Sequence, residues 1–119
     1  MTTKQILDLD FRNEDNQEII QRVLRQIKPL SKYSDEEDIP FEGIEKAIVV
    51  MSKKYNMRIR EFVPDVWANK TETIWRAIII DETDLSTAAI VYGISIYEVF
   101  AKCTVQMYAM VRKGITKRK

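Results

Sequence analysis

The chain has 119 residues, of which 45% are apolar and 31% are charged, and its formal net charge is +1. These values predict one globular domain with a core of its own, and they exclude a disordered chain and a globally basic nucleic-acid binder. The sequence has no histidine and only one cysteine, which excludes the commonest general base, the commonest metal ligand and any intramolecular disulfide.

Two helices are predicted in the N-terminal half. Residues 1–12 alternate weakly and fit a short edge strand or an extended arm. A helix is expected over residues 13–28, capped by Asn13 and ended by the proline that follows. A polar loop over 30–39 leads to a second helix over 41–55, whose apolar residues recur at helical spacing.

The pattern changes to a strand-like alternation at Met57. Residues 57–67 and 72–80 are rich in strand formers and are separated by a turn-like segment, so a β-hairpin is predicted. The alternative is a helix over 65–80, because short apolar runs fit both periods. A hairpin needs a helix across its apolar face, and the next segment can supply one.

Residues 84–113 form the longest apolar-rich segment. Asp84 is a candidate N-cap, Arg112 and Lys113 lie where a last helical turn favours cations, and Gly114 can end the helix. Apolar residues recur between these ends at three- and four-residue steps, which predicts an amphipathic helix.

Gly93 and Ser95 interrupt this helical pattern. Glycine weakens a helix interior, and Ser95 followed by Glu98 is typical of a helix start. One interpretation is a break near Gly93. The other is a continuous helix of about 45 Å, longer than a domain of this size and therefore covered by a partner chain. The stripe keeps its register through Tyr92 and Ile96, so we favour the continuous helix.

The predicted fold is therefore α+β: two N-terminal helices, a hairpin at about 57–80 and a long helix over 84–113. An all-α protein with four helices is the alternative. We expect residues 1–119 to form a single domain, with 114–119 as a basic flexible tail. The first residues lack the pattern of a secretory signal and no apolar run is long enough to span a bilayer, so a cytoplasmic location without membrane contact is predicted.

The predicted function is a small, non-enzymatic interaction or regulatory protein that binds an unknown protein partner. The apolar stripe on 84–113 predicts a homodimer, with Ala89 and Gly93 small enough for close approach of a second helix. The expected self-association residues are Ala89, Tyr92, Gly93, Ile96, Val99, Cys103 and Met107. No cofactor, metal site or catalytic residue is predicted, because the acidic clusters lack a metal-binding spacing and no activated nucleophile is recognisable.

The alternative function is a DNA-binding regulator. Small residues, a turn glycine and a capped second helix over about 84–103 resemble a helix-turn-helix. The candidate nucleic-acid contacts are Ser95, Tyr97, Lys102, Arg112, Lys113, Lys117 and Arg118. This alternative is not favoured, because the expected recognition helix has one cation and no Arg, Asn or Gln in its first turns.

Overall fold

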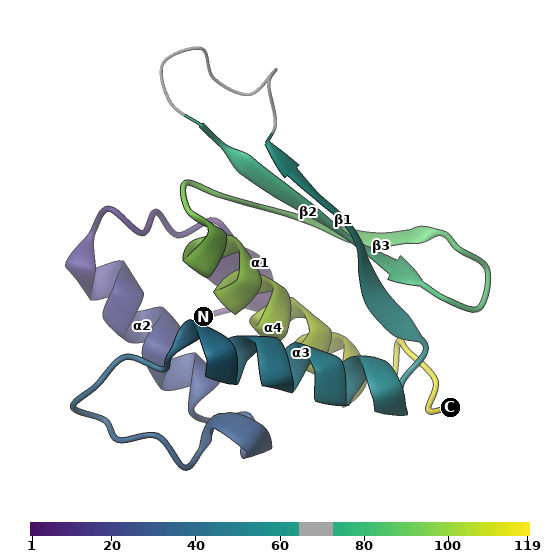
Figure 1. The fold of residues 1–119 in the computed structure, drawn as a ribbon, viewed down its shortest axis with the longest axis horizontal. Coiled ribbons are helices and arrows are strands. Elements are labelled where there is room, and N and C mark those ends of the chain that lie inside the picture. Colours follow the sequence, from purple (N-terminus) through teal and green to yellow (C-terminus); the bar gives the residue numbers. More distant parts are fainter. Residues whose placement is uncertain (65–72) are drawn as a thin grey trace.

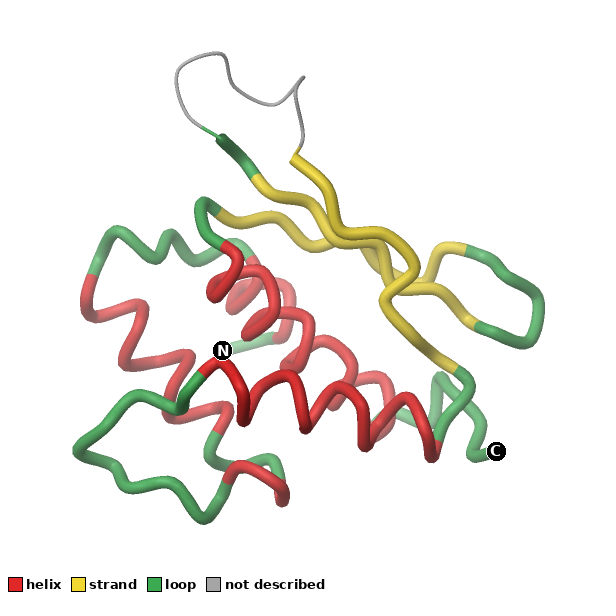
Figure 2. Tube along the Cα trace, in the orientation of Figure 1, coloured by secondary structure: helices red, strands yellow, loops and turns green. Residues whose placement is uncertain are grey.

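The computed structural model describes residues 1–64 and 73–119. A helical layer packs against one face of a three-stranded antiparallel sheet, as Figures 1 and 2 show. The helices are α1 (Thr3–Leu7), α2 (Glu14–Leu24), η1 (Lys28–Leu30), α3 (Phe41–Lys54) and α4 (Ile96–Arg112). The strands are β1 (Met57–Pro64), β2 (Trp75–Asp81) and β3 (Thr87–Gly93).

The helix α4 is the centre of the molecule. It contacts α1, α2 and α3 on one side and strands β2 and β3 on the other. Its buried residues lie on most of its faces, which explains why its sequence is apolar nearly all round. Ser95 caps it by accepting a hydrogen bond from the Glu98 amide at 3.1 Å.

The strand order is β1-β2-β3, so β2 is central and the other two strands form the edges. Both ladders are antiparallel, and each contains one irregularity. In β1 an extra residue, Arg60, stands between Ile59 and Glu61. In β3 the extra residue is Ala88, which leaves Ala89–Gly93 as a regular stretch.

Two buried clusters meet along α4. One packs α4 against the N-terminal elements and α3, and the other packs it against the inner face of the sheet. Phe100 and Tyr108 contact both clusters, so the core is continuous. Each buried aliphatic side chain stabilises the fold by about 1.5–3 kcal/mol.

The structure confirms the α+β fold, the helix that Asn13 caps and the hairpin. The Asn13 side chain accepts from the Asp15 amide at 2.9 Å, and β1 pairs with β2. Residues 65–72, which include the predicted turn, lie outside the described residues. The start of the chain forms the short helix α1 before an extended stretch, and α2 ends four residues earlier than expected, at Leu24.

The predicted continuous helix over 84–113 is wrong. Residues 87–93 form strand β3, and only 96–112 are helical. Asp84 caps a turn, where its carboxylate accepts from the Ser86 amide and hydroxyl. The alternative, a helix-turn-helix over about 84–103, is wrong for the same reason, since residues 87–93 form a strand where its first helix would lie.

The last six residues dock along the end of α3. The Asn56 amide donates to the Lys117 carbonyl at 3.0 Å, and Arg118 forms a β-bridge with Tyr55. Thr116 is buried. In the part of the chain that the structure describes, no helix has the length and apolar character needed to span a membrane.

Candidate functional site

The seven residues expected to form one self-association seam are divided between two elements. Val99, Cys103 and Met107 are fully buried in the core between α4 and the sheet, where no partner can reach them. Tyr92 and Ile96 remain accessible, at 45% and 42% exposed. The seam on a single helix is therefore wrong, although two of its residues lie at the surface.

The two small residues of the predicted seam serve packing within the chain. Ala89 lies on the inner face of the sheet. A Cβ on Gly93 would come within 2.9 Å of side-chain atoms of Glu98 and Val99. Gly93 thus lets α4, and not a second helix, approach the strand.

The residues expected to read DNA from the start of α4 are committed to internal contacts. Ser95 caps the helix. The Tyr97 hydroxyl accepts from Gln21 Nε2 at 2.8 Å and donates to the Ile39 carbonyl, while burial raises the pKa of the phenol. The Lys102 side chain is only 3% exposed. Because these three side chains are used within the fold, they are not available on the surface of α4 to contact DNA bases.

The remaining candidate cations lie at the other end of the molecule. Arg112 and Lys113 end α4, about 24 Å along the helix from Ile96, and the Arg112 guanidinium lies over the Tyr108 ring. Lys117 and Arg118 belong to the docked tail. The structure therefore does not bring the predicted nucleic-acid contacts together into one surface.

The face of the sheet opposite α4 carries an accessible apolar patch. Inward residues of the strands belong to the core cluster, so the alternating residues between them point outward. Ile90 and Tyr92 are each 45% exposed on β3, and they pair across the ladder with Ile78 and Arg76. We call the residues with this orientation the outer sheet face: Glu61, Val63, Arg76, Ile78, Ile90 and Tyr92.

None of the described helices covers this face (Figure 1). The Nε of Arg76 is buried there and has no hydrogen-bond partner among the described residues. Buried donors are normally paired, so this group is an unusual feature of the monomer surface.

The two edges of the sheet differ in how they are protected. Strand β1 carries exposed Arg58 and Arg60 at its edge, a bulge at Arg60 and a proline at its end. Such charges, bulges and prolines prevent an edge from pairing with another strand. Strand β3 has only the bulge at Ala88, and the sequence contains no charged residue from Leu85 to Tyr97. The regular stretch Ala89–Gly93 is thus an unprotected edge.

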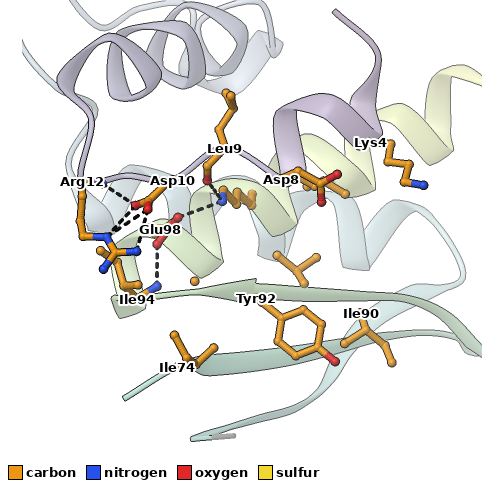
Figure 3. A pocket seen from close by; sticks show the side chains of 14 residues that line it. Lys4, Asp8, Leu9, Asp10, Arg12, Ile74, Ile90, Tyr92, Ile94 and Glu98 are labelled. Carbon is orange, nitrogen blue, oxygen red and sulfur yellow. Dashed lines mark hydrogen bonds and ion pairs between the residues drawn. The ribbon is translucent and has the colours of Figure 1, made fainter. Parts of the chain in front are cut away.

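A groove of about 500 Å³ runs beside this edge, between β3 and the N-terminal segment. Figure 3 shows residues Lys4 to Arg12 along one wall and Ile90 to Ile94 along the other. We call it the β3 groove. Ile90 and Tyr92 point away from the N-terminal segment, toward the outer sheet face.

A buried ion pair forms the floor of the β3 groove. Lys102 Nζ lies 2.8 Å from Glu98 Oε1 and donates a hydrogen bond to the Leu9 carbonyl. The Glu98 carboxylate also accepts from the amides of Phe11, at 3.3 Å, and Ile94, at 2.6 Å. These contacts fix the N-terminal segment and the end of β3 to α4, so both walls of the groove are held by one pair of side chains.

The rim of the groove is charged but internally balanced. The Arg12 guanidinium donates to both Asp10 carboxylate oxygens, and this hydrogen bonding lowers the pKa of Asp10 to about 2. Among the described residues no group of three or more Cys, Asp or Glu side chains could hold a metal ion. The accessible chemistry of the site is a strand edge and an apolar patch.

The sequence contained one usable signal for this site. Residues 89–93 alternate between inward and outward positions as a strand does, and the same residues also fit a helical stripe. Glu98 and Lys102 have the i,i+4 spacing of an ion pair on a helix, which the sequence shows. The sequence does not indicate that both side chains are buried. Comparison of the chain with protein-family models, with curated proteins and with solved structures finds no match.

Proposed function

We propose that the protein is a small, non-enzymatic interaction protein that self-associates through the β3 edge and the outer sheet face. The observation that carries this proposal is the unprotected, uncharged edge at Ala89–Gly93, next to exposed Ile90 and Tyr92. Natural sheets protect their edges against strand pairing, and β1 of this chain follows that rule. An edge left open beside an apolar patch is typical of a binding surface.

Three further features fit this proposal. The net charge of +1 leaves little long-range repulsion between two copies. The sequence has one cysteine and therefore no intramolecular disulfide, which fits a reducing, cytoplasmic compartment. The tight contacts of Tyr97, Glu98 and Lys102 with main-chain atoms stabilise the scaffold behind the surface, and a rigid scaffold lowers the entropic cost of binding.

Sedimentation velocity over a range of about 1–200 µM tests the proposal. The wild-type chain is expected to shift from monomer to dimer within this range, because a small edge interface gives micromolar affinity. Ile90→Lys and Tyr92→Lys each place a charge on the outer sheet face and are expected to raise the dissociation constant about tenfold or more.

Val49→Lys is the matched control. Val49 is 49% exposed on α3 and belongs to neither buried cluster, so its replacement removes a similar apolar surface outside the sheet. The control is expected to dimerise like the wild type, and circular dichroism should report the same fold for all variants. A wild-type chain that stays monomeric throughout the range overturns the proposal.

A further inference from the structure

We infer that two copies pair antiparallel through their β3 edges about a two-fold axis at Val91, so that two three-stranded sheets form one six-stranded sheet. This inference rests on the proposed function and names its geometry. In this geometry the two sheets meet edge to edge, and the two outer sheet faces do not pack against one another.

The regular part of β3 sets the register. The bulge at Ala88 disturbs the start of the strand, so the residues able to form a regular ladder are Ala89–Gly93. The middle of this stretch is Val91. A two-fold axis there places Val91 opposite its own copy and Ala89 opposite Gly93 of the second copy.

This register joins complementary side chains on both faces. On the outer face each Ile90 lies opposite a Tyr92 of the other copy, and both are 45% exposed in the monomer. A cross-strand pair of an aromatic and a β-branched residue stabilises a ladder by about 0.2–1 kcal/mol, and the symmetry supplies two such pairs. On the inner face Val91 lies opposite Val91 and Ala89 opposite Gly93, so no side chain larger than valine meets there and the second strand can approach without displacing α4.

The β3 groove leaves space for the added strand. It lies along the edge of β3 and separates that strand from residues Lys4 to Arg12 (Figure 3). The side chains at the bottom of the groove already have hydrogen-bond partners. Glu98 and Lys102 bind one another, and Glu98 accepts from neighbouring main-chain amides. A second strand therefore has to satisfy only the free main-chain groups of β3.

The absence of charge removes the usual barrier to such pairing. No Asp, Glu, Lys or Arg occurs between Leu85 and Tyr97, so no like charges meet between the two paired strands. An interface of five paired residues per copy is small, and the resulting dimer is expected to be weak and reversible.

Cysteine cross-linking distinguishes the edge pair from a face-to-face dimer. Directly opposite residues of antiparallel strands have Cα atoms about 4.5–5.5 Å apart, within disulfide range. A mixture of Ile90→Cys and Tyr92→Cys chains is expected to form a mixed disulfide on mild oxidation. Either variant alone is expected to cross-link about fivefold less or weaker still. In such a dimer the two introduced cysteines, both at position 90 or both at position 92, are diagonal neighbours about 7–8 Å apart.

Ile78→Cys is the matched control on the central strand. In the edge pair two copies of Ile78 are three strand spacings apart, about 14 Å, and are expected not to cross-link. In a face-to-face dimer they meet. Cys103 is buried and does not compete.

Residue-resolved amide exchange gives a second readout without any substitution. Alternate amides of β3 point away from β2 and are expected to exchange at least about tenfold more slowly in the dimer than in the monomer. A dimer that cross-links through Ile78→Cys, or leaves those amides unprotected, overturns the edge pairing, while self-association through the outer sheet face, the other part of the proposed function, stands. A chain that never dimerises overturns both.

Discussion

Gln21, Glu98 and Lys102 each bind main-chain atoms of segments that lie outside helices and strands. Gln21 Oε1 accepts from the Ile39 amide at 2.9 Å, and the other two hold the stretch around Leu9 and the end of β3. Buried main-chain groups without a partner cost about 1–3 kcal/mol each. These three side chains therefore replace the hydrogen bonds that regular structure would supply.

Cys103 makes the stability of the fold depend on pH in the alkaline range. Burial raises the pKa of its thiol to about 12, whereas an unfolded cysteine titrates near its ordinary value of about 8.5. Above that value the unfolded chain loses a proton that the folded chain keeps. The stabilisation is complete below the unfolded pKa and decreases as the pH rises toward the folded one.

Urea denaturation of the wild type and Cys103→Ala at about pH 8 and about pH 10.5 measures this contribution. Between the two pH values, the free energy of unfolding of the wild type is expected to fall by about 2 kcal/mol more than that of the variant. Comparing each protein with itself cancels the cavity that the alanine leaves. Equal losses in both proteins would mean that the thiolate is accommodated in the fold.

At the scale of elements, the N-terminal segment depends on α4. Leu9 and Phe11 are held by the Glu98–Lys102 pair, whose side chains are each 3% exposed. A buried pair is costly to desolvate, so its net contribution is small, but removal of one partner leaves an uncompensated charge. The i,i+4 pair thus fixes the position of a neighbouring segment more than it stabilises its own helix.

A double-mutant cycle on this pair tests that role. Glu98→Gln is expected to lower the free energy of unfolding by about 3–5 kcal/mol, and Lys102→Met by a comparable amount. In the double variant the loss in free energy of unfolding is expected to be at most about half of the sum of the two single losses, because no unpaired buried charge remains. A cost below about 1 kcal/mol for Glu98→Gln would mean that water reaches the pair.

The elements were predictable to different degrees. The helices α2 and α3 follow from their helical period, and in α2 also from the Asn13 cap, because each has one clear pattern. The pairing of β1 with β2 was predicted less firmly, because part of its sequence also fitted a helix over 65–80. β3 was missed because Tyr92 and Ile96 fit a helical stripe, whereas the strand face is set by contacts with β2. The Ser95–Glu98 signal marked the true start of α4, though Glu98 turns its carboxylate to the Ile94 amide.

The candidate site was harder to predict than the fold. A free edge is a property of strand order, and strand order depends on contacts between residues far apart in the sequence. The burial of Lys102 was also not predictable, since lysine is almost never fully buried. What the sequence did contain was an uncharged stretch from Leu85 to Tyr97, which has meaning only once β3 is known to be an edge.

At the scale of the whole molecule, the near-zero net charge conceals two charged regions. Asp35, Glu36, Glu37 and Asp38 lie in the loop before α3, whereas Lys53, Lys54 and the basic tail lie at the far end of that helix (Figure 1). Two copies could therefore attract one another head to tail through charge, and this arrangement competes with pairing through the β3 edge.

Ionic strength separates the two arrangements. Pairing through an uncharged strand is expected to change its dissociation constant by less than about twofold between about 0.05 and 0.5 M NaCl, because salt screens only charged contacts. A head-to-tail contact between the acidic loop and the basic end would weaken steeply over the same range. Sedimentation velocity at the two salt concentrations measures the difference, with Ile90→Lys as the variant that interferes only with the strand contact. Association that disappears at high salt and survives Ile90→Lys would place the interface at the charged ends of the molecule, away from β3.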